Sequence, residues 1–88
     1  MDLEGYYESI KSLVQDKREA KEEIERFKNL CKFVDERVNR ILQKKVALFI
    51  PSRNSNDIAV IVLRMYVHDK YGLETTYDNK GLTIYPKK

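Results

Sequence analysis

Two side chains in this sequence carry groups that commonly do chemistry, the imidazole of His68 and the thiol of Cys31. A histidine that acts as general acid, general base or metal ligand needs a partner aimed at the same point. No Asp, Glu or Cys stands three or four residues from His68, and the neighbouring Asp69 points about 100° away on a helix. We therefore expect an ordinary surface histidine, with no metal and no cofactor.

Cys31 lies among apolar residues in the middle of a predicted helix. A buried thiol has a raised pKa and behaves as a small hydrophobic side chain. One cysteine also excludes a disulfide framework and a cysteine-rich zinc site. We expect a structural thiol, which could oxidise to an interchain bond only if two parallel copies faced each other. The sequence therefore predicts a protein that is not an enzyme.

Basic residues in the second half form a thin edge that could contact phosphate. Arg53 lies in a polar loop before a predicted helix, where free backbone N–H groups favour an anion, but no glycine lets the backbone curl around a phosphate. The candidate phosphate contacts are Arg53, Lys80, Lys87 and Lys88. A hairpin after a helix is typical of winged DNA-binding domains, but this helix lacks a polar face for reading bases. A dimeric nucleic-acid-binding protein is the alternative.

Tyr6 and Tyr7 are the candidate protein-binding residues among six tyrosines. Tyrosine combines a large apolar ring with a polar tip and is common at contact surfaces. These two rings would stand at the open end of a long helix, where little else buries them. We expect a protein partner to bind there or on the second half of the chain.

Residues 1–45 are predicted to form the long helix that positions these rings. No Gly or Pro occurs for 45 residues between Gly5 and Pro51, and apolar residues recur with a seven-residue period. This period is the signature of a coiled coil. The predicted dimer seam consists of Leu3, Ile10, Leu13, Ile24, Phe27, Cys31, Val34, Val38 and Ile41.

A straight helix over these residues would be about 65 Å long, which exceeds the width of a globule of this size. The other 43 residues are too few to cover its whole apolar stripe. The cheapest cover is a second copy, so we expect a homodimer, with parallel and antiparallel pairing both open. The alternative is a helical hairpin bent around residues 16 to 23, or near Asn29 or Asn39, in which one chain covers itself.

Residues 46–88 are predicted to form a compact β-α-β-β head. The run at 46–50 is apolar at every position, which is typical of a strand buried on both faces. A helix follows over about 57–71 and ends at Gly72. Alternating apolar residues on both sides of the turn at 78–81 predict an antiparallel hairpin. The first strand should then lie at a sheet edge, or else between the hairpin strands by an unusual insertion. At an edge it would pair with its copy or be shielded by the coiled coil.

Composition limits the class of protein further. The chain has 88 residues, 42% of them hydrophobic, and a net charge of +3, which excludes full disorder and an acidic mimic of nucleic acid. No apolar run approaches a membrane span, and the acidic start does not resemble a signal peptide, so we expect a cytoplasmic protein without membrane contact. The sequence predicts an α+β homodimer that binds protein as an adaptor, accessory factor or inhibitor, presenting two identical surfaces.

Overall fold

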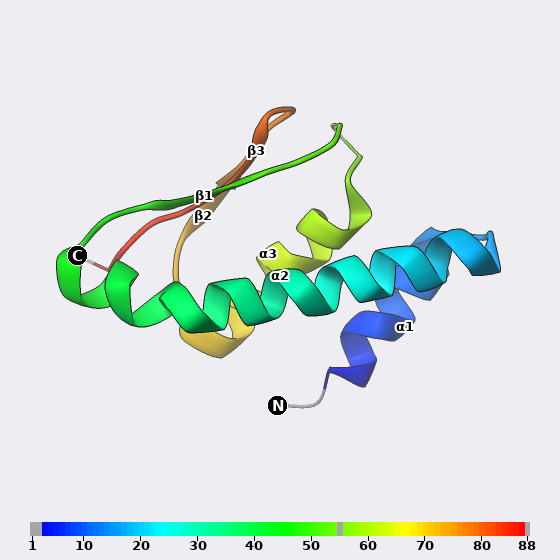
Figure 1. Cartoon of the computed structure of the whole chain (residues 1–88), viewed down its shortest axis with the longest axis horizontal. Helices are drawn as coiled ribbons and strands as arrows, with labels where there is room; N and C mark the ends of the chain where they lie inside the picture. The colour runs from blue at the N-terminus through cyan, green and yellow to red at the C-terminus, as the bar shows by residue number, and fades with distance from the viewer. Residues whose placement is uncertain (1–2, 55, 88) are drawn as a thin grey trace.

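The computed structural model describes residues 3–54 and 56–87, and within them it contains three helices and one three-stranded antiparallel sheet (Figure 1). This arrangement confirms the predicted mixture of helix and sheet. The elements in chain order are α1 (Glu4–Leu13), α2 (Lys17–Lys44), β1 (Leu48–Pro51), α3 (Ile58–Tyr71), β2 (Thr75–Tyr77) and β3 (Gly81–Ile84).

The prediction of one continuous helix over residues 1–45 was wrong, because the chain bends between α1 and α2. Val14 has an extended backbone, and the carboxylate of Asp16 accepts hydrogen bonds from the backbone N–H groups of Arg18 and Glu19 at 2.9 and 3.0 Å. Asp is a preferred residue at this N-cap position because its short side chain satisfies amide groups that a new helix leaves free. The bend lies next to the segment 16–23, where the alternative helical hairpin was placed.

The bend folds α1 back onto the other two helices, so the predicted seam is covered within one chain. The rings of Tyr6 and Tyr7 lie 5.8 and 6.1 Å from that of Phe27 on α2, and Tyr6 also packs on Tyr66 of α3. The buried seam residues are Ile10, Phe27, Cys31, Val34, Val38 and Ile41. Of the other seam residues, Leu3 and Ile24 are half-buried, and Leu13 has 57% of its surface exposed. The premise that a second copy must cover this stripe was therefore wrong, whereas the dimer itself stays a prediction.

Helix α2 is the longest element and runs along the long axis of the molecule (Figure 1). Its 28 residues span roughly 42 Å at the usual rise per residue, close to the largest dimension of 40 Å. α3 packs beside it, and the sheet lies along one side of the helices. α3 buries residues toward α2, α1 and the sheet, which confirms that this helix packs on more than one side.

The sheet has the order β1-β3-β2, so β1 lies at an edge, as predicted. Leu48 pairs with Ile84 and Ile50 with Leu82, and these side chains face the helices. Phe49 lies between them on the outer face and is 51% exposed. The prediction that this strand is buried on both faces was wrong, because the helices cover only one face of the sheet.

Candidate functional site

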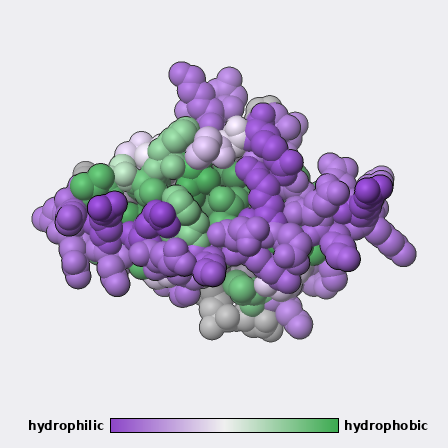
Figure 2. Space-filling view, viewed as in Figure 1, coloured by the Kyte–Doolittle hydropathy of each residue, from purple (hydrophilic) through white to green (hydrophobic). Residues whose placement is uncertain are grey.

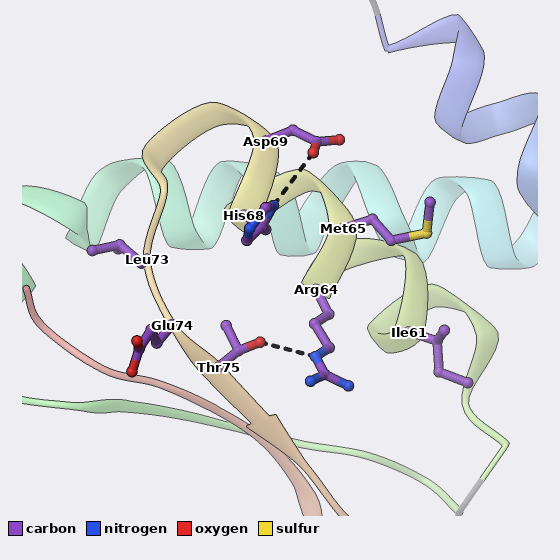
Figure 3. Close-up of a pocket in the computed structure, with 8 residues that line it drawn as sticks. All are labelled: Ile61, Arg64, Met65, His68, Asp69, Leu73, Glu74 and Thr75. Carbon is purple, nitrogen blue, oxygen red and sulfur yellow. Dashed lines mark hydrogen bonds and ion pairs between the residues drawn. The ribbon is translucent and has the colours of Figure 1, made fainter.

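The groove beside His68 lies on the outward face of α3, next to the start of β2 (Figure 3). It encloses about 600 Å³. The side chains that line it are Ile61, Arg64, Met65, His68, Asp69, Leu73, Glu74 and Thr75. Because it contains the single histidine, it is the candidate catalytic site.

The imidazole of His68 is held by no short contact in this groove. Its Nδ1 lies 3.6 Å from the Oδ1 of Asp69, which is too long for a hydrogen bond, and its side chain is 76% exposed. Asp69 instead accepts a hydrogen bond of 2.7 Å from the hydroxyl of Tyr6. The hydroxyl of Thr75 accepts a hydrogen bond from Arg64 at 2.9 Å. The groove thus presents a solvent-exposed imidazole without an oriented nucleophile beside it.

Cys31 points into the core between α2 and α3. Burial, followed by the nearby Asp35 carboxylate, raises the pKa of its thiol to about 12. A thiol in this environment stays protonated and reacts slowly. Among residues 3–54 and 56–87, no three His, Cys, Asp or Glu side chains gather as they would around a metal ion.

A polar cluster at the α2–α3 contact surrounds Asp35. Its carboxylate accepts hydrogen bonds from the hydroxyls of Tyr66, at 2.9 and 3.0 Å, and Tyr71. Lys70 donates to the hydroxyl of Tyr66 at 2.9 Å. Burial and the hydrogen bond to Asp35 raise the pKa of Tyr66 to about 12, although Lys70 acts in the opposite direction. The hydrogen bonds from Tyr66 and Tyr71 on α3 to Asp35 on α2 therefore join the two helices.

The predicted anion site before α3 is occupied by the protein's own carboxylates. Glu23, on α2, accepts hydrogen bonds from the guanidinium of Arg53 at 2.7 Å and from the backbone N–H of Ala59 at 3.1 Å. The N-terminus of α3 therefore already has a negative group at its positive end. Arg53 is consequently held in an ion pair at the position where we expected a contact to phosphate.

Asp57 is a second carboxylate at this contact between α2 and the start of α3. Its carboxylate accepts hydrogen bonds from Arg26 and from the backbone N–H of Arg53, and only 4% of the residue is exposed. Burial by itself disfavours the charged form, but these hydrogen bonds outweigh it and hold the pKa of Asp57 below its usual value. This junction joins α2 to the start of α3.

The other predicted phosphate contacts are not brought together by the fold. Lys80 lies in the turn before β3, whereas Lys87 follows the far end of β3 and approaches Gly72. Lys88 lies outside the described residues. Tyr6 and Tyr7, the predicted protein-binding pair, do not stand at an open helix end: Tyr6 is buried and Tyr7 is half-buried against Phe27.

A groove between α2 and β1 is the surface that sequence reasoning missed. It encloses about 390 Å³ and is lined mainly by apolar groups, from Arg26, Asn29, Leu30, Phe33, Phe49, Ile50 and Pro51. Figure 2 shows hydrophobic residues gathered on this face of the molecule, bordered by hydrophilic ones. Leu30 and Phe33 lie off the predicted seam, and these apolar residues outside the heptad pattern were the signal that could have revealed the surface.

One wall of this groove is a free strand edge. The backbone N–H of Ser52 donates to the carbonyl of Lys80 at 3.0 Å. Because bonding direction alternates along an antiparallel strand, Ile50 bonds toward β3, and the N–H and C=O groups of Phe49 point away from it. No other strand within the described chain pairs with this side of β1.

Beyond the groove, α2 carries positive side chains on the face that Phe33 occupies. The guanidinium carbon of Arg37 lies 3.7 Å from the ring centroid of Phe33, and Arg40 and Lys44 continue the same face at spacings of three and four residues. Glu36 is the nearest acidic neighbour of Arg37, at 3.7 Å. Arg26 lies at the other end of the groove and is paired with Asp57.

No protein-family model matches the chain, and neither the search of curated proteins nor that of solved structures found a similar protein. No helix within the described residues is long and apolar enough to cross a membrane.

Proposed function

We propose that this protein is a non-catalytic protein-binding module that holds an extended, acidic segment of a partner protein in the groove between α2 and β1. The observation that carries the proposal is the free edge of β1 beside an apolar groove. An added strand forms backbone hydrogen bonds to such an edge, and side-chain pockets next to it provide specificity. An adaptor, an accessory factor or an inhibitor would use such a surface.

The contacts of β1 define what kind of segment fits. Phe49 offers both an N–H and a C=O group, whereas Pro51 has no N–H and ends the bonding edge. A strand pairs at about 4.8 Å from its neighbour, so an added segment would lie over the exposed rings and methyl groups of the groove. Alternate side chains of the segment would cover Leu30 and Phe33, which favours an apolar residue at every second position.

Charge favours an acidic partner. Arg37, Arg40 and Lys44 follow the groove along the same face of α2 and would attract carboxylates of the bound segment. Arg37 lies over the ring of Phe33, and its one acidic neighbour among the described residues is Glu36 at 3.7 Å. Complementary charge speeds association and makes it dependent on salt. We therefore expect affinity to fall as ionic strength rises.

Selection from a displayed library of random peptides tests this proposal. We expect enriched peptides to alternate apolar residues with Asp or Glu. Phe49→Ser and Arg37→Glu should each weaken binding of an enriched peptide by about tenfold or more. Met65→Ser is the matched control, because Met65 is an exposed apolar residue in the groove beside His68.

Either of two results would contradict the proposal: no enrichment above a library without protein, or enriched peptides that bind Phe49→Ser and Arg37→Glu as well as the parent chain. Unfolding of each variant is measured alongside, so that a loss of folding is not counted as a loss of binding.

A homodimer through β1 is the second candidate. Two antiparallel copies of β1 paired at Phe49 would form a two-fold interface in which each strand bonds to the other. This surface replaces the predicted seam, most of whose residues are buried within one chain. Sedimentation at increasing concentration tests it: a doubled mass that Phe49→Ser abolishes supports the dimer, and a constant single-chain mass rejects it.

Nucleic-acid binding has weaker support, because Arg53 is ion-paired and Lys80 and Lys87 lie at opposite ends of β3. Titration with random duplex and single-stranded DNA at low salt measures it.

A further inference from the structure

A separate hollow lies where α1 turns back into α2, away from the groove of the proposed function. It encloses about 690 Å³, within the range typical of small-molecule sites. Its floor is apolar and consists of Val14, which lies in the bend, and Ala20 and Ile24 of α2. Val14 and Ala20 are buried, and Ile24 is half-buried.

The hollow exists because Ala20 is small. Residues 13, 20, 27, 34 and 41 occupy one heptad position, and Ala20 has the smallest side chain of the five. Where two helices meet, a small side chain at the contact leaves space that a larger one would fill. Val14 and Ile24 border that space, so its floor offers apolar contacts to a ligand.

Lysines surround this apolar floor. Lys17 and Lys21 lie on the same face of α2 as Ala20 and Ile24, and neither forms an ion pair with another described residue. Lys11 also lines the hollow and is 3.4 Å from Glu8. The rim therefore keeps two positive charges without a bound carboxylate.

The other charged residues near the hollow do not neutralise Lys17 and Lys21. Lys28 lines the hollow, lies 3.4 Å from Glu25 and stands over the ring of Tyr7 at 5.3 Å. Glu25 is the one acidic residue in the lining. Asp16, next to Lys17 in the chain, accepts two backbone hydrogen bonds at the start of α2.

We propose that this hollow binds a small amphipathic anion, an acyl or aryl chain that carries a carboxylate or phosphate group. The chain would lie on Val14, Ala20 and Ile24, and the anionic head would contact the ammonium groups of Lys17 and Lys21. A neutral apolar ligand would make no contact with the two ammonium groups, and inorganic phosphate would make no contact with the apolar floor. Both parts of the ligand are therefore required.

Titration of the isotope-labelled full chain with monomeric decanoate, followed by amide NMR, tests the proposal. We expect saturable shifts confined to the α1–α2 bend and the first turns of α2. The double variant Lys17→Gln and Lys21→Gln should bind at least about tenfold more weakly. The double variant Lys32→Gln and Lys80→Gln removes the same charge elsewhere and should bind like the parent.

A second variant tests the floor independently of charge. Ala20→Leu fills the hollow, so decanoate binding should be lost while thermal unfolding shows that the chain still folds. If Ala20→Leu unfolds the chain, Ile24→Gln serves instead, since Ile24 is only half-buried. Unchanged affinity in the folded variant would overturn the proposal.

Three comparison ligands show which feature of decanoate is recognised: its charge, its apolar chain, or a lipid surface that contains both. Decanol and inorganic phosphate should each bind at least about tenfold more weakly than decanoate. Equal binding of decanol, or binding of inorganic phosphate as tight as that of decanoate, would overturn the proposal. So would binding to vesicles of phosphatidylcholine and phosphatidylglycerol without binding of monomeric decanoate, because the recognised feature would then be a membrane surface.

Discussion

Cys31 illustrates how burial changes the chemistry of a reactive side chain. Its pKa is raised to about 12 by burial and by Asp35, so almost no thiolate exists at neutral pH. We expect iodoacetamide at about pH 8 to alkylate the folded chain at least about 100-fold more slowly than a short cysteine peptide. The same chain in concentrated urea should react like the peptide. Rapid alkylation of folded protein would show that the thiol is accessible.

Asp57 should make stability depend on pH in the acid range. Its pKa is lowered in the folded chain, so its stabilising effect is full above the ordinary carboxyl range and is lost as pH falls through the lowered pKa. We expect Asp57→Asn to lower the free energy of unfolding near neutral pH by about 3 kcal/mol, because the charge that pairs with Arg26 is lost and an NH2 group replaces one of the two oxygens that accept from Arg26 and the Arg53 amide.

Denaturant unfolding at a series of pH values measures this effect. The difference between the parent chain and Asp57→Asn should shrink as pH falls below about 4. Glu22→Gln, an exposed acidic residue on α2, is the control and should change stability little at any pH. A difference that stays constant down to acid pH would mean that the charge of Asp57 contributes nothing.

The helices and strands give a matched pair of glycine substitutions. Gly5 lies inside α1 with open space around it, so Gly5→Ala should raise the free energy of unfolding by about 0.5–1 kcal/mol. A Cβ on Gly81 would meet the carbonyl oxygen of Ile50 and lie 2.9 Å from the Cα of Pro51. We therefore expect Gly81→Ala to be destabilising, because β1 and β3 must separate. Equal effects of the two variants in denaturant unfolding would contradict this packing.

The bend between α1 and α2 depends on Asp16. Replacing it with Ala removes the cap from α2 and should cost about 1 kcal/mol of stability. Asp16→Ser is the control, because a serine hydroxyl can cap the same amide groups and should restore most of the loss. If both variants were as stable as the parent chain in denaturant unfolding, the capping bond would have no energetic role.

For the molecule as a whole, the question is whether its core lies within one chain. Phe27 contacts Tyr6 and Tyr7 of α1 and Tyr66 of α3 in the same chain. The thermal midpoint should therefore stay constant from about 5 to about 500 µM, since unfolding that does not release a partner is independent of concentration. Phe49→Ser tests separately for pairing through β1. A midpoint that rises with concentration in Phe49→Ser would indicate that the helices pair between chains.

Local sequence signals were sufficient for much of the second half of the chain. The helix before Gly72, the hairpin around residues 78–81 and the edge position of the first strand depend on residues close together in the chain, or on the rule that hairpin strands are neighbours. Such signals act over a few residues and were read correctly. The side chain of Asp16 was also a local signal, a helix cap, but it was overlooked.

What covers an apolar stripe is not encoded in its period. The seven-residue repeat around Phe27 and Val34 showed that the stripe must be buried, but a second chain or a folded-back α1 and α3 bury it equally well. The groove beside β1 was hidden for the same reason: whether Phe33 and Phe49 are covered depends on how helices and sheet are placed in space. The seven-residue repeat therefore identified which side chains must be buried. Which segments bury them depends on contacts between residues far apart in the chain, and only the tertiary structure decided that.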